Sequence, residues 1–116
     1  MAEVPVTPGS ANFSNYVAIG DSFAAGYSDG ALFKRGQENS YTSILASQFK
    51  QVGGGTFNVP FCGDDNLGGL LFSGTPIQGT RLYFNGTGPV SVSGLPVTEV
   101  LNHLTGPFNN LGVPGA

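Results

Sequence analysis

The sequence predicts an α/β domain with a parallel sheet, and three observations support this prediction. Residues 16–19 form a short apolar run rich in β-forming side chains, and Gly20 ends it, as expected of a buried strand followed by a turn. Residues 40–52 carry apolar side chains at helical spacing, and residues 110–113 are typical of the end of a second core strand. A strand, a glycine-containing loop and a helix, in this order, open an α/β unit, in which ligands bind beyond the carboxyl ends of the strands.

The composition fits one small, turn-rich domain. The chain has 116 residues with 19 glycines and 8 prolines, and 9% of its residues are charged, against about 25% in ordinary soluble domains. Residues 1–14 mix Pro, Ser, Thr and Gly without apolar periodicity, so we expect a flexible leader there, with residues 1–10 poorly ordered. Residues 15–116 are then the folded part.

Charge and cysteine content exclude several classes of function. A net charge of -3 with only four Lys and Arg residues leaves no basic stripe for nucleic acid. No apolar run approaches the roughly 18 to 20 residues of a membrane span, and no signal peptide is evident, so the chain as given is expected to be soluble. The single cysteine, Cys62, cannot form an intrachain disulfide and has no metal-ligand spacing to other residues, so we expect a small, partly buried side chain. We expect no metal and no cofactor.

The helix at residues 40–52 has well-marked ends. Ser40 or Asn39 can serve as the N-cap, Lys50 lies in the last turn, and three glycines at residues 53–55 end it. One face holds the apolar side chains Tyr41, Ile44, Leu45, Phe49 and Val52.

Between residues 56 and 94, Gly, Pro and Asn divide the chain into short stretches. Residues 81–84 and 90–92 flank Asn85-Gly86, a pair that favours the positive φ values of tight hairpin turns, so they predict a β-hairpin inserted into the α/β core. Residues 96–104 are predicted to form a short helix. We interpret four aromatic side chains of this region as core rather than as a substrate groove, namely Phe57, Phe72, Tyr83 and Phe84.

The segment Gly20-Asp21-Ser22 places a serine directly after the first strand, ahead of a loop of small residues. Such a position exposes the hydroxyl and leaves backbone N–H groups free to stabilise a developing oxyanion, as acyl transfer requires. Gly, Asp and Ser are also the ordinary residues of turns, so a turn serine is the alternative interpretation.

These residues resemble the first block of the SGNH (GDSL-type) hydrolases, in which Gly-Asp-Ser follows an apolar strand. The family's second block, an Asn followed five residues later by a Gly, resembles Asn110 and Gly115. The resemblance implies a three-layer α/β/α, flavodoxin-like fold with a parallel sheet, present here as an N-terminal portion with a β-hairpin insertion. It implies that Ser22 is the nucleophile, that the N–H groups of Ser22 and Gly115 form the oxyanion hole, and that Asp21 and Gly20 support the loop.

Nearly the whole chain is similar to envelope SGNH lipoproteins of Bacteroidetes-type bacteria. This similarity implies a secreted, periplasmic or envelope-anchored natural form, with Met1 added to a mature sequence, and an ester substrate such as an acylated carbohydrate or lipid. The family's third block, Gly-x-Asn-Asp, and its closing Asp-x-x-His are absent. We therefore expect an incomplete domain that is nearly inactive alone, and a half sheet that self-associates or pairs with a missing C-terminal segment.

Alternatives remain for several of these residues. His103 and Glu99, at i and i+4 of the predicted short helix, would make an improvised triad with Ser22, but a surface histidine is the simpler interpretation. Asp64-Asp65-Asn66 suggests a calcium site, but the spacing of these residues does not match the ligand positions of a calcium-binding loop. A turn is therefore the favoured interpretation. A different class of function is a non-catalytic, Gly-rich surface module that binds a partner or glycan.

Overall fold

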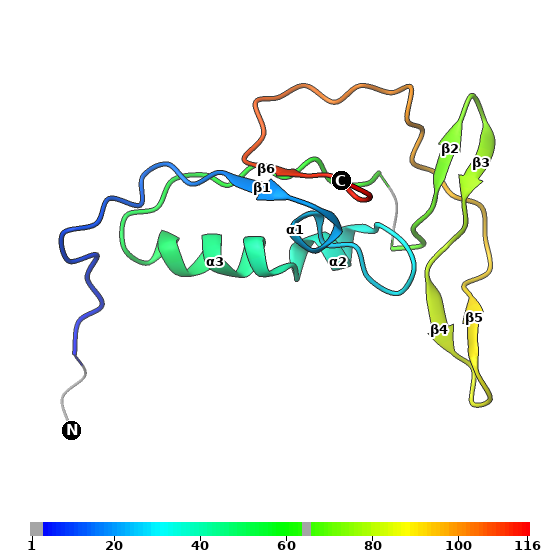
Figure 1. The fold of residues 1–116 in the computed structure, drawn as a ribbon, viewed down its shortest axis with the longest axis horizontal. Helices are drawn as coiled ribbons and strands as arrows, with labels where there is room; N and C mark the ends of the chain where they lie inside the picture. The colour runs from blue at the N-terminus through cyan, green and yellow to red at the C-terminus, as the bar shows by residue number, and fades with distance from the viewer. Residues whose placement is uncertain (1–3, 64–65) are drawn as a thin grey trace.

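The computed structural model describes residues 4–63 and 66–116, and it shows a mixed α/β fold with a small parallel sheet and two β-hairpins (Figure 1). The elements in chain order are β1 (Ala18–Gly20), α1 (Ser22–Ala25), α2 (Lys34–Glu38), α3 (Tyr41–Lys50), β2 (Leu70–Phe72), β3 (Thr75–Gln78), β4 (Leu82–Phe84), β5 (Pro89–Ser91) and β6 (Asn110–Gly112).

The parallel sheet joins the two ends of the domain. Strand β1 pairs with β6 in parallel, with Ala18 opposite Asn110 and Gly20 opposite Gly112. The N–H of Val113 donates to the carbonyl of Gly20 at 2.9 Å, which extends the ladder past the end of β6. Both predicted strands and their parallel pairing are thus confirmed, and helices α1 and α3 lie beside this sheet (Figure 1).

Helix α3 confirms the predicted helix with slightly shorter bounds. Ser40 is its N-cap, since the Ser40 side chain accepts a hydrogen bond from the N–H of Ser43. At the other end Gly53 has a φ of +89°, a left-handed conformation that glycine adopts without strain, and the N–H of Gly54 donates back to the carbonyl of Phe49 at 2.8 Å.

The predicted burial of β1 is wrong, and the apolar face of α3 is buried only in part. Of the β1 residues only Ala18 is buried, while the side chain of Ile19 is 80% exposed. Tyr41, Ile44 and Leu45 of α3 are also exposed, and the buried residue of this helix is Thr42. Thr42 packs toward α1 and bonds to Ala24 and Asn110, so this edge of the helix is covered, while Phe49 packs on Phe13 and Tyr16.

Small side chains make up most of the core, so the chain segments approach one another closely. The buried apolar residues are Ala18, Ala24, Ala25, Ala31, Phe33 and Cys62. A second cluster holds the region before β1 against α3, where Phe13 stacks on Phe49 at a ring distance of 4.6 Å and Tyr16 stacks on Phe57 at 5.0 Å. Burial, followed by the neighbouring Tyr41, raises the pKa of Tyr16.

Two hairpins project from one end of the molecule (Figure 1). Strands β4 and β5 pair antiparallel around residues 85–88, which confirms the predicted hairpin, and β2 and β3 form a second one that the sequence did not indicate. The assignment of Phe72, Tyr83 and Phe84 to the core is wrong, because each hairpin is a separate two-stranded sheet and leaves these rings exposed. Phe57 alone of the four is partly buried.

The predicted helix at residues 96–104 does not form. Instead, the N–H of Leu71 donates to the carbonyl of Thr98 at 2.8 Å, and the N–H of Val100 donates to the carbonyl of Leu71 at 2.9 Å. These bonds place Glu99 in a parallel bridge beside β2. The backbone groups that a helix would have used are therefore committed to the edge of the β2–β3 hairpin.

Candidate functional site around Ser22

Ser22 opens the four-residue helix α1 directly after β1. Asp21 is the N-cap, and its carboxylate accepts a hydrogen bond from the N–H of Phe23 at 3.0 Å. The helix ends at Gly26, whose φ of +93° is left-handed, and the N–H groups of Gly26 and Tyr27 both donate to the carbonyl of Ser22. The backbone on both sides of Ser22 is thus fixed by local hydrogen bonds.

A buried polar network ties α1 to the neighbouring elements. The side-chain amide of Asn110, which is 2% exposed, donates to the carbonyl of Ala24 at 2.8 Å and to the Thr42 hydroxyl at 3.1 Å. Thr42 also donates to the carbonyl of Ala24, at 2.9 Å, and the Asn110 side-chain oxygen accepts from the N–H of Gly112 at 3.0 Å. Three of these bonds therefore join β6, α1 and α3, and the fourth fixes the Asn110 side chain within β6.

Two strand glycines let α1 approach the sheet. A Cβ at Gly20 would lie 2.8 Å from the Cβ of Ala24, and a Cβ at Gly112 would lie 2.7 Å from the carbonyl carbon of Ala24 and closer still to the N of Ala25. Any larger residue would push α1 away from the ends of both strands. The resemblance drew attention to Gly20 but not to Gly112.

The hydroxyl of Ser22 is available for chemistry. Its residue is half-buried, and within the described part of the chain the hydroxyl and the N–H of Ser22 have no hydrogen-bond partner. Gly115 lies in an exposed turn closed by the bond from the N–H of Ala116 to the carbonyl of Val113, and its own N–H is likewise unpaired among the described residues. Ser22 and Gly115 follow the carboxyl ends of two paired parallel strands, β1 and β6.

Neither member of the alternative triad is arranged as that interpretation requires. His103 is exposed in a segment without helix, so the i, i+4 relation to Glu99 is lost. The Glu99 carboxylate accepts from the N–H groups of Ser73 and Gly74, and these bonds, that of Gly74 above all, lower the pKa of Glu99. The Glu99 carboxylate therefore stabilises the β2–β3 turn. It is not positioned to orient a histidine.

The described residues hold no group of three or more His, Cys, Asp and Glu side chains that could bind a metal ion. Asp64 and Asp65, considered above for calcium, lie outside the described residues. Asn66, which follows them, accepts a hydrogen bond from the N–H of Arg35 at 2.7 Å through its side-chain oxygen.

A hollow lies next to Phe23, the residue after Ser22, and the sequence did not indicate it. It has a volume of about 330 Å³, and its wall includes the rings of Phe23, Tyr27 and Tyr41. Phe23 directly follows Ser22, and its side chain is largely exposed. Phe23 and Tyr27 are four residues apart, but Tyr41 lies 14 residues further along the chain in another helix, so no local pattern predicted that the three share a surface.

Comparisons of the chain with models of protein families, with curated proteins and with solved structures found no match to any of them. In the described structure, no helix combines the length and the apolar character that crossing a membrane requires.

Proposed function

We propose that this chain carries the nucleophile and oxyanion donors of an SGNH-type serine ester hydrolase, whose complete domain would have three layers, α/β/α. The observation that supports it best is the placement of Ser22, whose unpaired hydroxyl and N–H follow β1 while the unpaired N–H of Gly115 follows the adjacent parallel strand β6.

In the proposed reaction the Ser22 oxygen attacks the carbonyl carbon of an ester and loses its proton to a base. The carbonyl oxygen becomes an oxyanion, and the N–H groups of Ser22 and Gly115 would stabilise it. Collapse of this intermediate breaks the bond to the alcohol, which leaves with a proton, and forms acyl-Ser22. Water then hydrolyses the acyl-enzyme and returns the serine.

The base is the component that these residues do not supply. A serine hydroxyl without a proton acceptor is a poor nucleophile near neutral pH, so the chain alone should react slowly. We propose that a further segment or a partner provides the base in a natural protein of the cell envelope. Dissolved imidazole, a small general base, should replace it in part.

The substrate proposal rests on the hollow lined by Phe23, Tyr27 and Tyr41. Its aromatic wall begins one residue after the nucleophile, so it could accept the acyl group of an ester. Acyl groups on carbohydrates or lipids fit this arrangement.

A fluorophosphonate probe tests the proposal, since it phosphonylates only activated serines. We expect slow labelling of the chain, at least about tenfold faster in imidazole, and none of the Ser22→Ala variant. The matched control, Ser93→Ala, removes another serine from an exposed residue and should label like the parent chain. Labelling that is unaffected by Ser22→Ala, or absent in imidazole while a known serine esterase reacts, would refute the esterase function.

The second candidate is a binding module without catalysis, and the exposed rings of the two hairpins favour it. Phe72, Tyr83 and Phe84 present aromatic faces to water, as surfaces that bind glycans or proteins often do. A chain that never reacts with the probe but whose hairpin resonances shift with an added glycan would have this function.

A further inference from the structure

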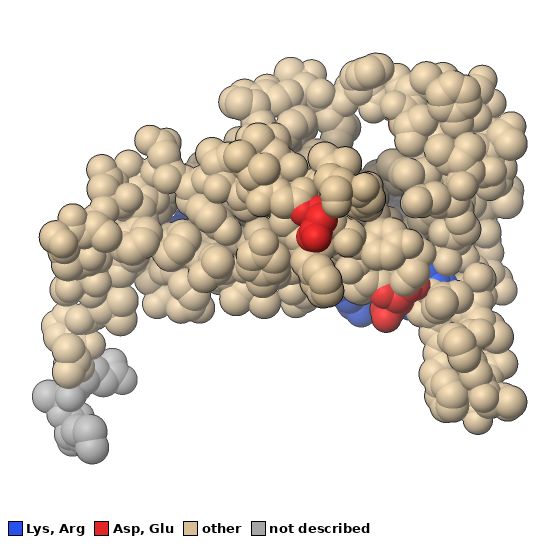
Figure 2. Space-filling view, viewed as in Figure 1, with Lys and Arg blue, Asp and Glu red and all other residues tan. Residues whose placement is uncertain are grey.

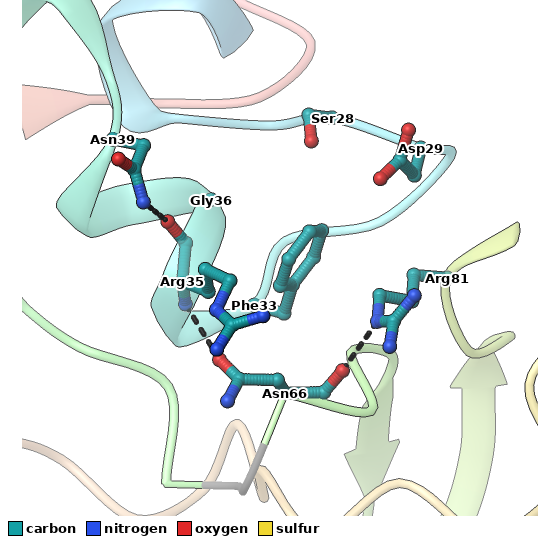
Figure 3. Close-up of a pocket in the computed structure, with 8 residues that line it drawn as sticks. All are labelled: Ser28, Asp29, Phe33, Arg35, Gly36, Asn39, Asn66 and Arg81. Atoms are coloured by element: carbon teal, nitrogen blue, oxygen red, sulfur yellow. Dashed lines mark hydrogen bonds between the residues drawn. The ribbon is translucent and has the colours of Figure 1, made fainter. Parts of the chain in front are cut away.

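A second hollow adjoins the first, since Ser28, Gly36 and Asn39 line both, and its lining is largely polar. It has a volume of about 320 Å³, at the small end of the range for ligand sites. Figure 3 shows Ser28 and Asp29 on the loop after α1, Arg35 on α2, and Arg81 just before β4, arranged around the ring of Phe33 with Asn66 opposite the loop. Three separate parts of the chain therefore build this hollow.

The two arginines gather half of the positive charge of the chain in one place. The sequence has only four Lys and Arg residues, and Arg35 and Arg81 both line this hollow. Among the described residues neither guanidinium forms an ion pair with a carboxylate. Figure 2 shows how sparse charged side chains are on the face that it presents.

Arg81 is held in place before any ligand arrives. Its Nε donates to the backbone carbonyl of Asn66 at 2.6 Å, and its guanidinium lies over the ring of Phe33, 5.5 Å from the centroid. These contacts leave the two terminal nitrogens of the guanidinium for another acceptor. Because less side-chain freedom is lost on binding, a fixed guanidinium favours binding of an oxyanion, either a carboxylate or a phosphate.

Asp29 limits the charge of the ligand. It lines the same hollow, so the charged side chains in the described lining add up to one positive charge. A single carboxylate would neutralise this charge, whereas a doubly charged phosphate ester would leave the hollow with a net negative charge, which is less favourable beside Asp29. Hydroxyl and amide groups of Ser28 and Asn39 in the lining suit ligand hydroxyls.

We propose that this hollow is a binding site for a hydroxylated carboxylic acid of monosaccharide size, such as a sugar acid, held through its carboxylate by Arg35 and Arg81. The hollow shares Ser28, Gly36 and Asn39 with the one proposed for the acyl group, but Ser22 does not line it, so the proposal does not depend on the esterase function.

The test is a titration with D-galacturonate, followed by calorimetry and by the amide resonances of Ser28 and Arg81. We expect saturable binding that shifts these resonances, with D-galactose and D-galactose 6-phosphate binding at least about tenfold more weakly. Equal binding of the neutral sugar or of the phosphate ester, or no saturation with galacturonate, would overturn the proposal.

Two variants change the charge of the site in opposite directions. Arg35 has no hydrogen bond from its side chain among the described residues, so Arg35→Gln should fold and weaken galacturonate binding about tenfold. Asp29→Asn should tighten it and admit the phosphate ester. Lys50→Gln removes an exposed cation from α3, outside the hollow, and should bind like the parent chain. A response of Lys50→Gln equal to that of Arg35→Gln would mean general charge attraction and refute the site.

Discussion

Asn110 fixes the position of the candidate nucleophile without touching it. Its amide donates to the carbonyl of Ala24 and to Thr42, so one buried side chain joins the end of the sheet to the helix that Ser22 opens. A buried polar group is costly unless its hydrogen bonds are made, and those of Asn110 are made on both its nitrogen and its oxygen. We therefore assign Asn110 a positioning role.

Replacing Asn110 with Ala should lower the free energy of unfolding by about 1 to 3 kcal/mol, because Ala24 and Thr42 would lose buried partners. Urea denaturation measures this change. The control Asn102→Ala alters an exposed side chain and should leave the unfolding midpoint almost unchanged. An equal midpoint for both variants would show that the network does not stabilise the fold.

The resemblance singled out Ser22, Asp21 and Gly115 from sequence, but it gave Thr42 no role. Thr42 lies seven residues before Phe49, at the edge of the apolar face of α3, and a threonine beside larger apolar side chains gives no signal of being the buried residue. In the fold Thr42 bonds to Ala24 of α1 and Asn110 of β6, while the large apolar side chains Tyr41, Ile44 and Leu45 are exposed. A contact that is 68 residues apart in sequence, between Thr42 and Asn110, leaves no local pattern.

Elements with local signals were predicted well and elements with long-range partners were not. The cap of α3 and the Asn-Gly turn between β4 and β5 depend on neighbours in sequence, so residue type predicted both. The segment at residues 96–104 depends on the edge of β2, a distant partner. Its weak helical pattern was overridden by hydrogen bonds to Leu71.

The β2–β3 hairpin should weaken in acid through Glu99. The pKa of Glu99 is lowered in the folded chain by backbone N–H groups, so its contribution is complete above the ordinary glutamate pKa of about 4.3 and is lost as pH falls through the lowered value. The amide proton shifts of Ser73 and Gly74, followed from pH 7 to pH 2, should titrate with a midpoint below the ordinary value.

The variant Glu99→Gln should remove this titration and reproduce the acid shifts at neutral pH, because the amide lacks the charge that these N–H groups bind. Glu38→Gln, an exposed change on α2, is the control and should leave the titration in place. A midpoint at or above the ordinary value would contradict the assigned bonds.

At the scale of the molecule the chain is extended and has a small core. Its radius of gyration is 16.9 Å, against about 13 Å for a compact domain of this length, and its accessible surface is 7611 Å², against about 5,900 Å². Figure 1 shows the hairpins standing apart from the sheet and helices. The sequence indicated a parallel sheet and a hairpin. How these parts pack against each other depends on contacts between distant residues, which no periodic pattern in the sequence predicts.

The small core leaves the outer face of the parallel sheet uncovered in the described structure. It carries four exposed aliphatic side chains, Val17, Ile19, Leu111 and Val113. Aliphatic groups clustered on a sheet whose edges are open favour association in water. We therefore propose that a second copy of the chain or a further segment covers this face.

The most direct measurement of the central claim is an NMR titration with an alkyl boronic acid, which bonds to a serine oxygen and imitates the tetrahedral intermediate. Because Ser22 and Gly115 are proposed to face the same oxyanion, their amide resonances should move together on one binding curve, and Ser22→Ala should abolish both shifts. A boronate that leaves Gly115 unmoved, or that shifts it equally in the Ser22→Ala variant, would contradict the account.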